Sequence, residues 1–200
     1  DTGLDGKHRP NCGANNLLVV YDPKSGKLEY RAPHPVNDYS HGLASVDINS
    51  DGLLDHLVLN SPHINWGSCG KSDSTEKSYF LISQPNGTYE MMPVIFDSGV
   101  GNLKLYYDAG HAVKYDNKIF FVLGRGHNKN VKSGIDVFEL RDGYMLSKLK
   151  FLPGPSNLRS VSYSDIASVG DYVLANAVDT TNGWRGRHMQ VLRIKNTEFD

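Results

Sequence analysis

The stretch Asp47-Ile-Asn-Ser-Asp-Gly-Leu-Leu-Asp55 has carboxylate or amide side chains at Asp47, Asn49, Asp51 and Asp55 and a glycine at its sixth position. Alternate residues of a tight loop point inward, and Gly52 lets the backbone turn with positive φ. Three carboxylates this close repel one another unless a cation lies between them. An acidic, solvated turn without metal is the alternative interpretation. The stretch therefore predicts a Ca²⁺ loop, whose ligands would be the side chains of Asp47, Asn49, Asp51 and Asp55 and the carbonyl of Leu53.

The sequence on either side of this loop reads as two β-strands, at residues 42–47 and 56–59. An EF-hand has helices on both sides and a glutamate at the twelfth position, where this chain has Val58. A dockerin repeat needs an acidic or amide ligand at this twelfth position, followed by a helix, so Val58 and the strand around it exclude a dockerin repeat as well. A calcium loop inside a β-hairpin resembles the FG-GAP/VCBS repeat, which is the calcium-loop blade of integrin-α-like, secreted seven-bladed β-propellers.

Internal repeats extend this hairpin pattern along the chain. Four segments join an apolar strand, a turn rich in Gly, Asn, Asp or Pro, and a second strand, with starts roughly 55 to 60 residues apart. They cover residues 16–30, 78–90, 135–146 and 189–199. Three of them follow another hairpin, at residues 42–59, 111–123 and 165–175. Four antiparallel strands per repeat form the blade of a β-propeller.

We therefore expect an all-β fold, namely a partial β-propeller with about three and a half four-stranded blades. The single domain 1–200 would hold the outer strands of one blade at 1–33, the calcium-loop blade at 40–98, and further blades at 107–152 and 160–200. Closed propellers have roughly four to eight blades, so we expect missing sequence or a second chain to complete a seven-bladed ring. A Greek-key sandwich is the alternative architecture.

Composition excludes some partners. The net charge of −1 gives no attraction to nucleic acid or acidic lipid, and no apolar stretch is long enough to span a bilayer. The first residue is Asp1 rather than methionine, which indicates a processed product or a fragment. The triplet Asn86-Gly-Thr88 is a glycosylation sequon, with Asn86 as the acceptor. The family resemblance implies an extracellular or cell-surface location.

The predicted loops between the second and third strands of each blade share Arg, His, Asn and Trp. In a propeller they lie on the face opposite the calcium loop. Tryptophan can stack on a sugar ring, and arginine can donate to carboxylate, sulfate or hydroxyl groups. Tryptophans packed between blades and solvated charges are the alternative. The predicted ligand-binding residues are Asn65, Trp66, Arg125, His127, Trp184, Arg185 and Arg187.

Both cysteines, Cys12 and Cys69, fall in equivalent loops of neighbouring blades in this alignment. A disulfide bond between them would join the two blades and would place the protein outside the cytosol. Two unpaired thiols are the alternative.

The predicted innermost strands begin with residues that could do acid–base chemistry. His41 and His111 are expected at equivalent positions, and a His with a Tyr could serve as base and acid. Some propeller polysaccharide lyases use such a pair, with an arginine that neutralises a uronate carboxylate. No nucleophile elbow, phosphate loop or CxxC pair supports another enzyme class. The candidate catalytic residues are His41, His111, Tyr163 and Arg125.

The resemblance thus implies a secreted, calcium-stabilised binding or adhesion module that recognises a glycan or an extracellular protein. Two alternatives remain from the sequence. One is a polysaccharide-degrading enzyme of the lyase type, and the other is a structural segment of a larger extracellular assembly.

Overall fold

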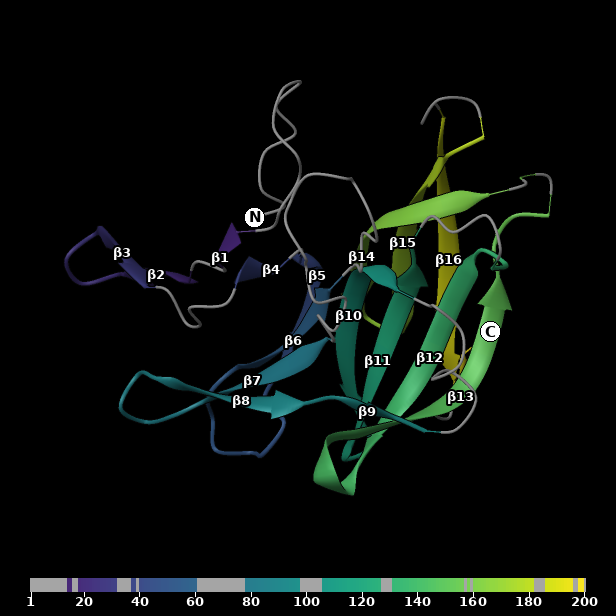
Figure 1. Cartoon of the computed structure of the whole chain (residues 1–200). Helices are drawn as coiled ribbons and strands as arrows, with labels where there is room; N and C mark the ends of the chain where they lie inside the picture. Colours follow the sequence, from purple (N-terminus) through teal and green to yellow (C-terminus); the bar gives the residue numbers. More distant parts are fainter. Residues whose placement is uncertain are drawn as a thin grey trace.

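A computed structural model of the chain describes residues 14–15, 18–31, 37–38, 40–60, 78–97, 106–126, 131–156, 158, 160–181, 186–195 and 198–199. Their regular structure consists of β-strands and one short 3₁₀ turn, η1 (Asp142–Tyr144) (Figure 1). The all-β prediction is confirmed for this part of the chain. Its residues include no helix long and apolar enough to cross a membrane.

Three large sheets follow one another along the described chain. The first is antiparallel and consists, in order, of β5 (Ser40–Val46), β6 (Asp55–Asn60), β7 (Tyr79–Ser83) and β8 (Tyr89–Pro93). The second consists of β10 (Tyr107–Tyr115), β11 (Lys118–Arg125), β12 (Gly134–Arg141), β13 (Met145–Pro153) and, parallel to β13, β9 (Ile95–Phe96). The third consists of β14 (Val161–Val169), β15 (Tyr172–Asp179), β16 (Arg187–Lys195) and β17 (Glu198–Phe199).

Two small ladders precede these sheets. They are β1 (Ala14–Asn15) with β4 (Asn37–Asp38), and β2 (Leu18–Asp22) with β3 (Lys27–Arg31). The strand pairs predicted from the internal repeat are therefore present. They correspond to β2–β3, β7–β8, β12–β13 and β16–β17.

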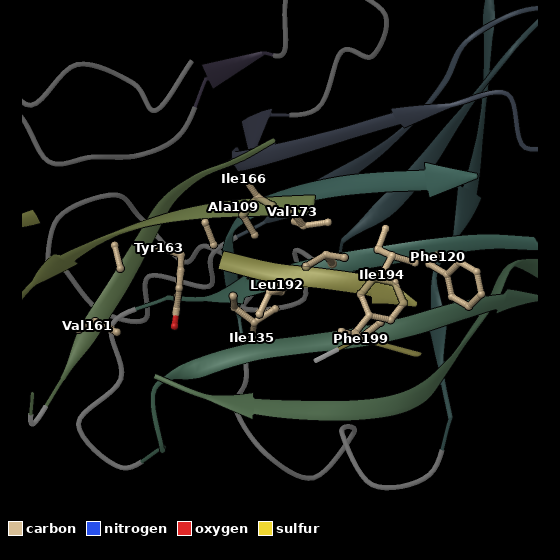
Figure 2. Close-up of a cluster of buried hydrophobic side chains, with 14 residues drawn as sticks. Ala109, Phe120, Ile135, Val161, Tyr163, Ile166, Val173, Leu192, Ile194 and Phe199 are labelled. Carbon is tan, nitrogen blue, oxygen red and sulfur yellow. The ribbon is translucent and has the colours of Figure 1, made fainter. Parts of the chain in front are cut away.

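The second sheet is buried on both of its faces. Residues 119–123 of β11 are all buried, and their side chains alternate between two hydrophobic cores. Phe121 and Leu123 pack with the first sheet, whereas Phe120 and Val122 pack with the third. Figure 2 shows Phe120 beside Phe199 of the third sheet. Burial on both faces explains why this strand is continuously apolar instead of alternating with polar residues.

The first strands of the three sheets lie side by side, with β10 in contact with both β5 and β14 (Figure 1). Glycines permit this close approach. A Cβ atom on Gly42 would lie 2.9 Å from the carbonyl oxygen of Asp108, and one on Gly124 would lie 2.4 Å from the Cβ of Tyr163. Neither contact is possible for a larger residue without movement of the backbone.

We expect Gly124→Ala to destabilise the fold, because its methyl group would overlap the Tyr163 side chain close to the backbone. Overpacking of this kind costs about 1–3 kcal/mol. The melting temperature, measured by circular dichroism, should fall by about 2–4 °C for each kcal/mol. Gly154→Ala is the control, since its Cβ would come only to 3.3 Å from a Val161 methyl group. Equal melting temperatures for Gly124→Ala and the wild type would contradict the close approach of β11 and β14.

Candidate functional sites

The loop predicted to bind Ca²⁺ joins β5 to β6 and is held by side chains that accept backbone hydrogen bonds. Ser50 and Gly52 have positive φ values of 61° and 87°, which turn the backbone inward. The Asp47 carboxylate accepts from the N–H groups of Asp51 (3.1 Å) and Gly52 (3.0 Å). Asp51 in turn accepts from the N–H of Leu53 (2.8 Å). The acidic side chains therefore gather around one turn.

The other two predicted side-chain ligands complete this arrangement. Asn49 accepts from the Asp51 N–H (3.1 Å) and donates its amide to the Asp51 carboxylate (2.9 Å). Asp55 is fully buried, and its two oxygens accept from the N–H groups of Ile48 and Ser83, both at 2.8 Å. Because Ser83 belongs to β7, Asp55 fastens the loop to the third strand of its sheet.

The predicted ligand atoms suit Ca²⁺, but their arrangement does not yet form a coordination site. The predicted ligands are all oxygen atoms, which a hard cation prefers. Among the described residues, however, no group of three or more His, Cys, Asp or Glu side chains is gathered so that it could hold a metal ion. The carboxylates instead accept hydrogen bonds from the backbone N–H groups of the loop. To coordinate Ca²⁺, the carboxylate side chains would have to rotate toward a common centre.

A second polar cluster lies at the other end of the inner strands. Each inner strand has a register shift near its start, between Ser40 and Gly42, between Tyr107 and Ala109, and between Tyr163 and Asp165. These shifts are β-bulges, which re-aim side chains and are frequent beside functional sites. The bulged residues are therefore equivalent in the three sheets, and they are His41, Asp108 and Ser164.

Asp108 links the three inner strands through its carboxylate. Ser162 of β14 donates its hydroxyl to Asp108 Oδ2 (2.7 Å), and His41 Nδ1 of β5 lies 3.4 Å from Asp108 Oδ1. Burial, and then the negative charge of Asp108, raise the pKa of Tyr106 to about 12. At this distance the carboxylate interacts with the imidazole through its charge, and Asp108 Oδ1 accepts no hydrogen bond from the described residues. His41 was predicted as a candidate from the sequence, whereas Asp108 was missed; its signal would have been its alignment with His41.

The predicted equivalence of His41 and His111 is wrong. The register places His111 three residues beyond the bulge, where the first sheet has Ala44. There His111 Nε2 lies 2.8 Å from the Ser168 hydroxyl. The hydroxyl of Tyr163 donates to Gln190 Oε1 (2.7 Å), and burial raises the pKa of Tyr163 to about 12. The proposed acid and base residues thus have separate partners.

Arg125 lies in a different environment from the solvent-facing rim that the sequence suggested. It is only 6% exposed, and Nε and Nη2 donate to Asp136 at 2.7 and 3.0 Å. The fully buried Asp136 also accepts from Lys148 Nζ (2.7 Å) and from the hydroxyl of Tyr107 (2.9 Å). The guanidinium carbon lies 4.0 Å from the centre of the Phe151 ring. These contacts assign Arg125 to a buried structural network.

The remaining predicted sites divide between exposed and undescribed residues. Arg187 begins β16 and is exposed. Asn86 lies in the exposed turn between β7 and β8, where its side-chain oxygen accepts from the N–H and hydroxyl of Thr88. The other predicted ligand-binding residues and both cysteines lie outside the described residues, namely Asn65, Trp66, His127, Trp184, Arg185, Cys12 and Cys69.

We expect stability to fall in acid partly because of His111. Burial lowers the pKa of its imidazole below the usual 6.5, although the nearby Asp165 carboxylate opposes this shift. The unfolded chain therefore binds a proton that the folded protein does not, and stability is lost as the pH falls below about 6.5. His111→Gln removes this titration, so its melting temperature should fall less between about pH 7.5 and about pH 5.

Burial also lowers the pKa of His56, so His111→Gln should reduce the acid sensitivity without abolishing it. The double variant with His56→Gln should reduce it further. The same loss of melting temperature in the wild type and in both variants would contradict this assignment.

Comparison with protein-family models gives no match, and comparison with curated proteins finds no similar sequence. Among solved structures, the fold is similar to that of the periplasmic gluconolactonase PpgL of Pseudomonas aeruginosa, with a TM-score of 0.54 and 12% sequence identity. The alignment covers 89% of this chain and 46% of the gluconolactonase chain, so this chain spans about half the length of that protein. At this identity the likeness shows the fold alone, which is of the β-propeller type.

Proposed function

We propose that the chain is part of an extracellular β-propeller, in which the three large sheets are successive four-stranded blades and residues 47–55 bind a structural Ca²⁺. The observation that carries this proposal is the loop between β5 and β6, where the side chains of Asp47, Asn49 and Asp51 surround a single turn. The likeness to a propeller-type protein and the bulge shared by the inner strands support the architecture.

The role of Ca²⁺ in this proposal is to neutralise charge and to fix one hairpin. The ion would be held by the side chains of Asp47, Asn49, Asp51 and Asp55 and by the carbonyl of Leu53. Asp55 is fully buried and bonded to the backbone of β7, so tighter packing of the loop would also fix the third strand of the sheet. The metal would then stabilise the blade without taking part in a reaction.

We place ligand recognition at the opposite end of the sheets. There Asp108, His41 and Ser162 come from three inner strands and supply both acceptors and donors. Hydroxyl-rich ligands are recognised by such mixed polar groups, so a glycan or another sugar-type molecule is the proposed ligand class. The structural neighbour is named as a gluconolactonase, which is consistent with a sugar-derived ligand.

An enzyme is the second candidate, and the contact between Asp108 and His41 favours it. Asp108 lies 3.4 Å from His41 Nδ1 and can orient the ring, so His41 could act as a general base. A lyase would need an arginine to neutralise the uronate carboxylate, and Arg125 does not fit this role because it forms a salt bridge with Asp136. A hydrolase that acts on a sugar-derived substrate needs only the base and a water molecule.

We expect Ca²⁺ to raise the melting temperature relative to EGTA, and Asp51→Asn to lose most of that rise. The amide keeps an acceptor for the Leu53 N–H but removes one ligand charge, so the stability in EGTA should change little. A free Ca²⁺ concentration of 100 times the Kd would stabilise by about 2.7 kcal/mol. The rise should therefore be about 5–10 °C.

Asp142→Asn is the control for this measurement, because it changes an exposed carboxylate in a different turn. It should keep the full response to Ca²⁺. No response to Ca²⁺ in the wild type would rule out the metal site, and an undiminished response in Asp51→Asn would place the site elsewhere.

Binding and catalysis are separated by one pair of experiments. In a glycan-array screen, followed by calorimetry with the best ligand, Asp108→Asn should weaken binding about tenfold or more, since it removes a charged acceptor. Asp142→Asn should bind normally. We expect no hydrolysis of gluconolactone above the spontaneous rate.

If the chain hydrolyses gluconolactone and His41→Gln slows that hydrolysis about a hundredfold or more, the enzyme proposal is correct and the proposal of a binding module is wrong. A chain that binds no glycan and hydrolyses no lactone would contradict both candidates.

A further inference from the structure

Three cations surround one phenyl ring on the second sheet. The ring is that of Phe151 in β13, which is half-buried. The guanidinium carbon of Arg125 lies 4.0 Å from the ring centre, and the Nζ atoms of Lys148 and Lys132 lie 5.6 and 5.8 Å from it. Arg125 ends β11, Lys132 lies between β11 and β12, and Lys148 belongs to β13, so neighbouring strands bring the three groups together (Figure 1). We name these three residues the cationic cluster.

The described residues only partly balance the charge of the cationic cluster. Asp136 is fully buried and pairs with both Arg125 and Lys148, at 2.7 Å in each case. No described carboxylate pairs with Lys132. Burial, and then the charge of Asp136, raise the pKa of Tyr107, so its hydroxyl stays neutral and adds no negative charge. Three cations therefore share one carboxylate, and positive charge is left over at a site partly shielded from water.

Two of the three cations are accessible to a ligand. Arg125 is only 6% exposed, and its Nε, Nη1 and Nη2 atoms all donate to Asp136 or to the carbonyl of Lys132. The Lys148 side chain is 29% exposed, and Lys132 is exposed. An ammonium group has three donors, and the described acceptor of Lys148 Nζ is Asp136 alone. Ammonium groups form their strongest hydrogen bonds with anions such as carboxylate and sulfate.

The cationic cluster lies at the same end of the second sheet as the Asp108 cluster. Arg125 pairs with Tyr107, which directly precedes Asp108. A Cβ atom on Gly126, the residue after Arg125, would lie 2.6 Å from Asp108 Oδ2. The Asp108 carboxylate therefore lies beside the end of β11. It attracts hydroxyl groups and repels anions, so an anionic group of a ligand at this end is drawn to the lysines instead.

We propose that Lys132 and Lys148 form a subsite for a carboxylate or sulfate group of an acidic sugar ligand. Arg125 and Asp136 are positioning residues, because they hold Lys148 and the Phe151 ring in place. The inference rests on the proposed function, since it names the charge class of the glycan bound at this end of the sheets. It differs from the sequence prediction, in which Arg125 itself contacts the ligand.

Calorimetry with two matched pairs of oligosaccharides tests this subsite. One pair is an oligogalacturonate and its neutral methyl ester, and the other is a sulfated and an unsulfated dextran oligosaccharide. The wild type should bind the acidic member of at least one pair about tenfold or more tightly than the neutral member. The pair that shows this preference identifies carboxylate or sulfate as the bound group. The preference should shrink as NaCl rises from about 50 to about 300 mM, because salt screens exposed charges.

Lys132→Met and Lys148→Met should each weaken binding of the acidic sugar about fivefold or more and leave the neutral sugar unaffected. Lys132→Met is the safer variant for folding, because its described hydrogen bond to Arg125 uses only the backbone carbonyl. Lys114→Met is the matched control, since Lys114 is an exposed lysine of β10 whose Nζ lies 3.4 Å from Ser50 Oγ in the calcium loop. It should bind both sugars as the wild type does. Far-ultraviolet circular dichroism identifies any variant that fails to fold.

The outcomes separate this inference from the proposed function. Equal affinity for the acidic and neutral members of both pairs overturns the subsite and leaves glycan binding intact. A preference for acidic sugars that both lysine variants keep, or that Lys114→Met loses equally, also overturns it. Failure to bind any glycan, in the array as well, contradicts the proposed function and this inference together.

Discussion

Face-to-face packing on both sides of the β10–β13 sheet is the constraint on which the rest of the structure depends. Its β11 strand sends Phe121 and Leu123 into one core and Phe120 and Val122 into the other. Because side chains alternate along a strand, a shift of one residue would exchange these two sets. The register of the middle sheet therefore also fixes how the first and third sheets are placed.

Burial of the middle sheet on both faces makes polar groups inside it costly. Asp136 is fully buried and is compensated by Arg125, Lys148 and Tyr107. Burial, and then the charge of Asp136, raise the pKa of the Tyr107 hydroxyl far above its usual value. Removal of one partner from such a network leaves an uncompensated charge, which costs more than the intact network contributes. The network therefore constrains which residues can occupy these positions.

The sequence predicted the strand pairs well and the polar sites less well. Hairpins such as β7–β8 combine local apolar runs with a turn, so their signal lies within about fifteen residues. His111 was misplaced because the start of its strand was: β10 begins at Tyr107, four residues before His111, whereas β5 begins at Ser40, one residue before His41. The burial of Arg125 depends on Asp136 of the neighbouring strand. The contact of Asp108 with His41 and Ser162 depends on the packing of three sheets.

The two ends of the inner strands differ in how their conformation is determined. In the loop between β5 and β6, all the backbone donors of residues 51–53 have side-chain acceptors inside the loop itself, so local sequence is sufficient to shape it. At the opposite end, Asp108 and its partners come from strands that are distant in the sequence. The loop therefore takes its shape from residues close to it in the sequence, whereas the Asp108 cluster exists only when all three sheets are in register. Among the described residues, the Asp108 cluster joins side chains of all three sheets, so it is where the structure best supports chemistry that needs residues from several sheets.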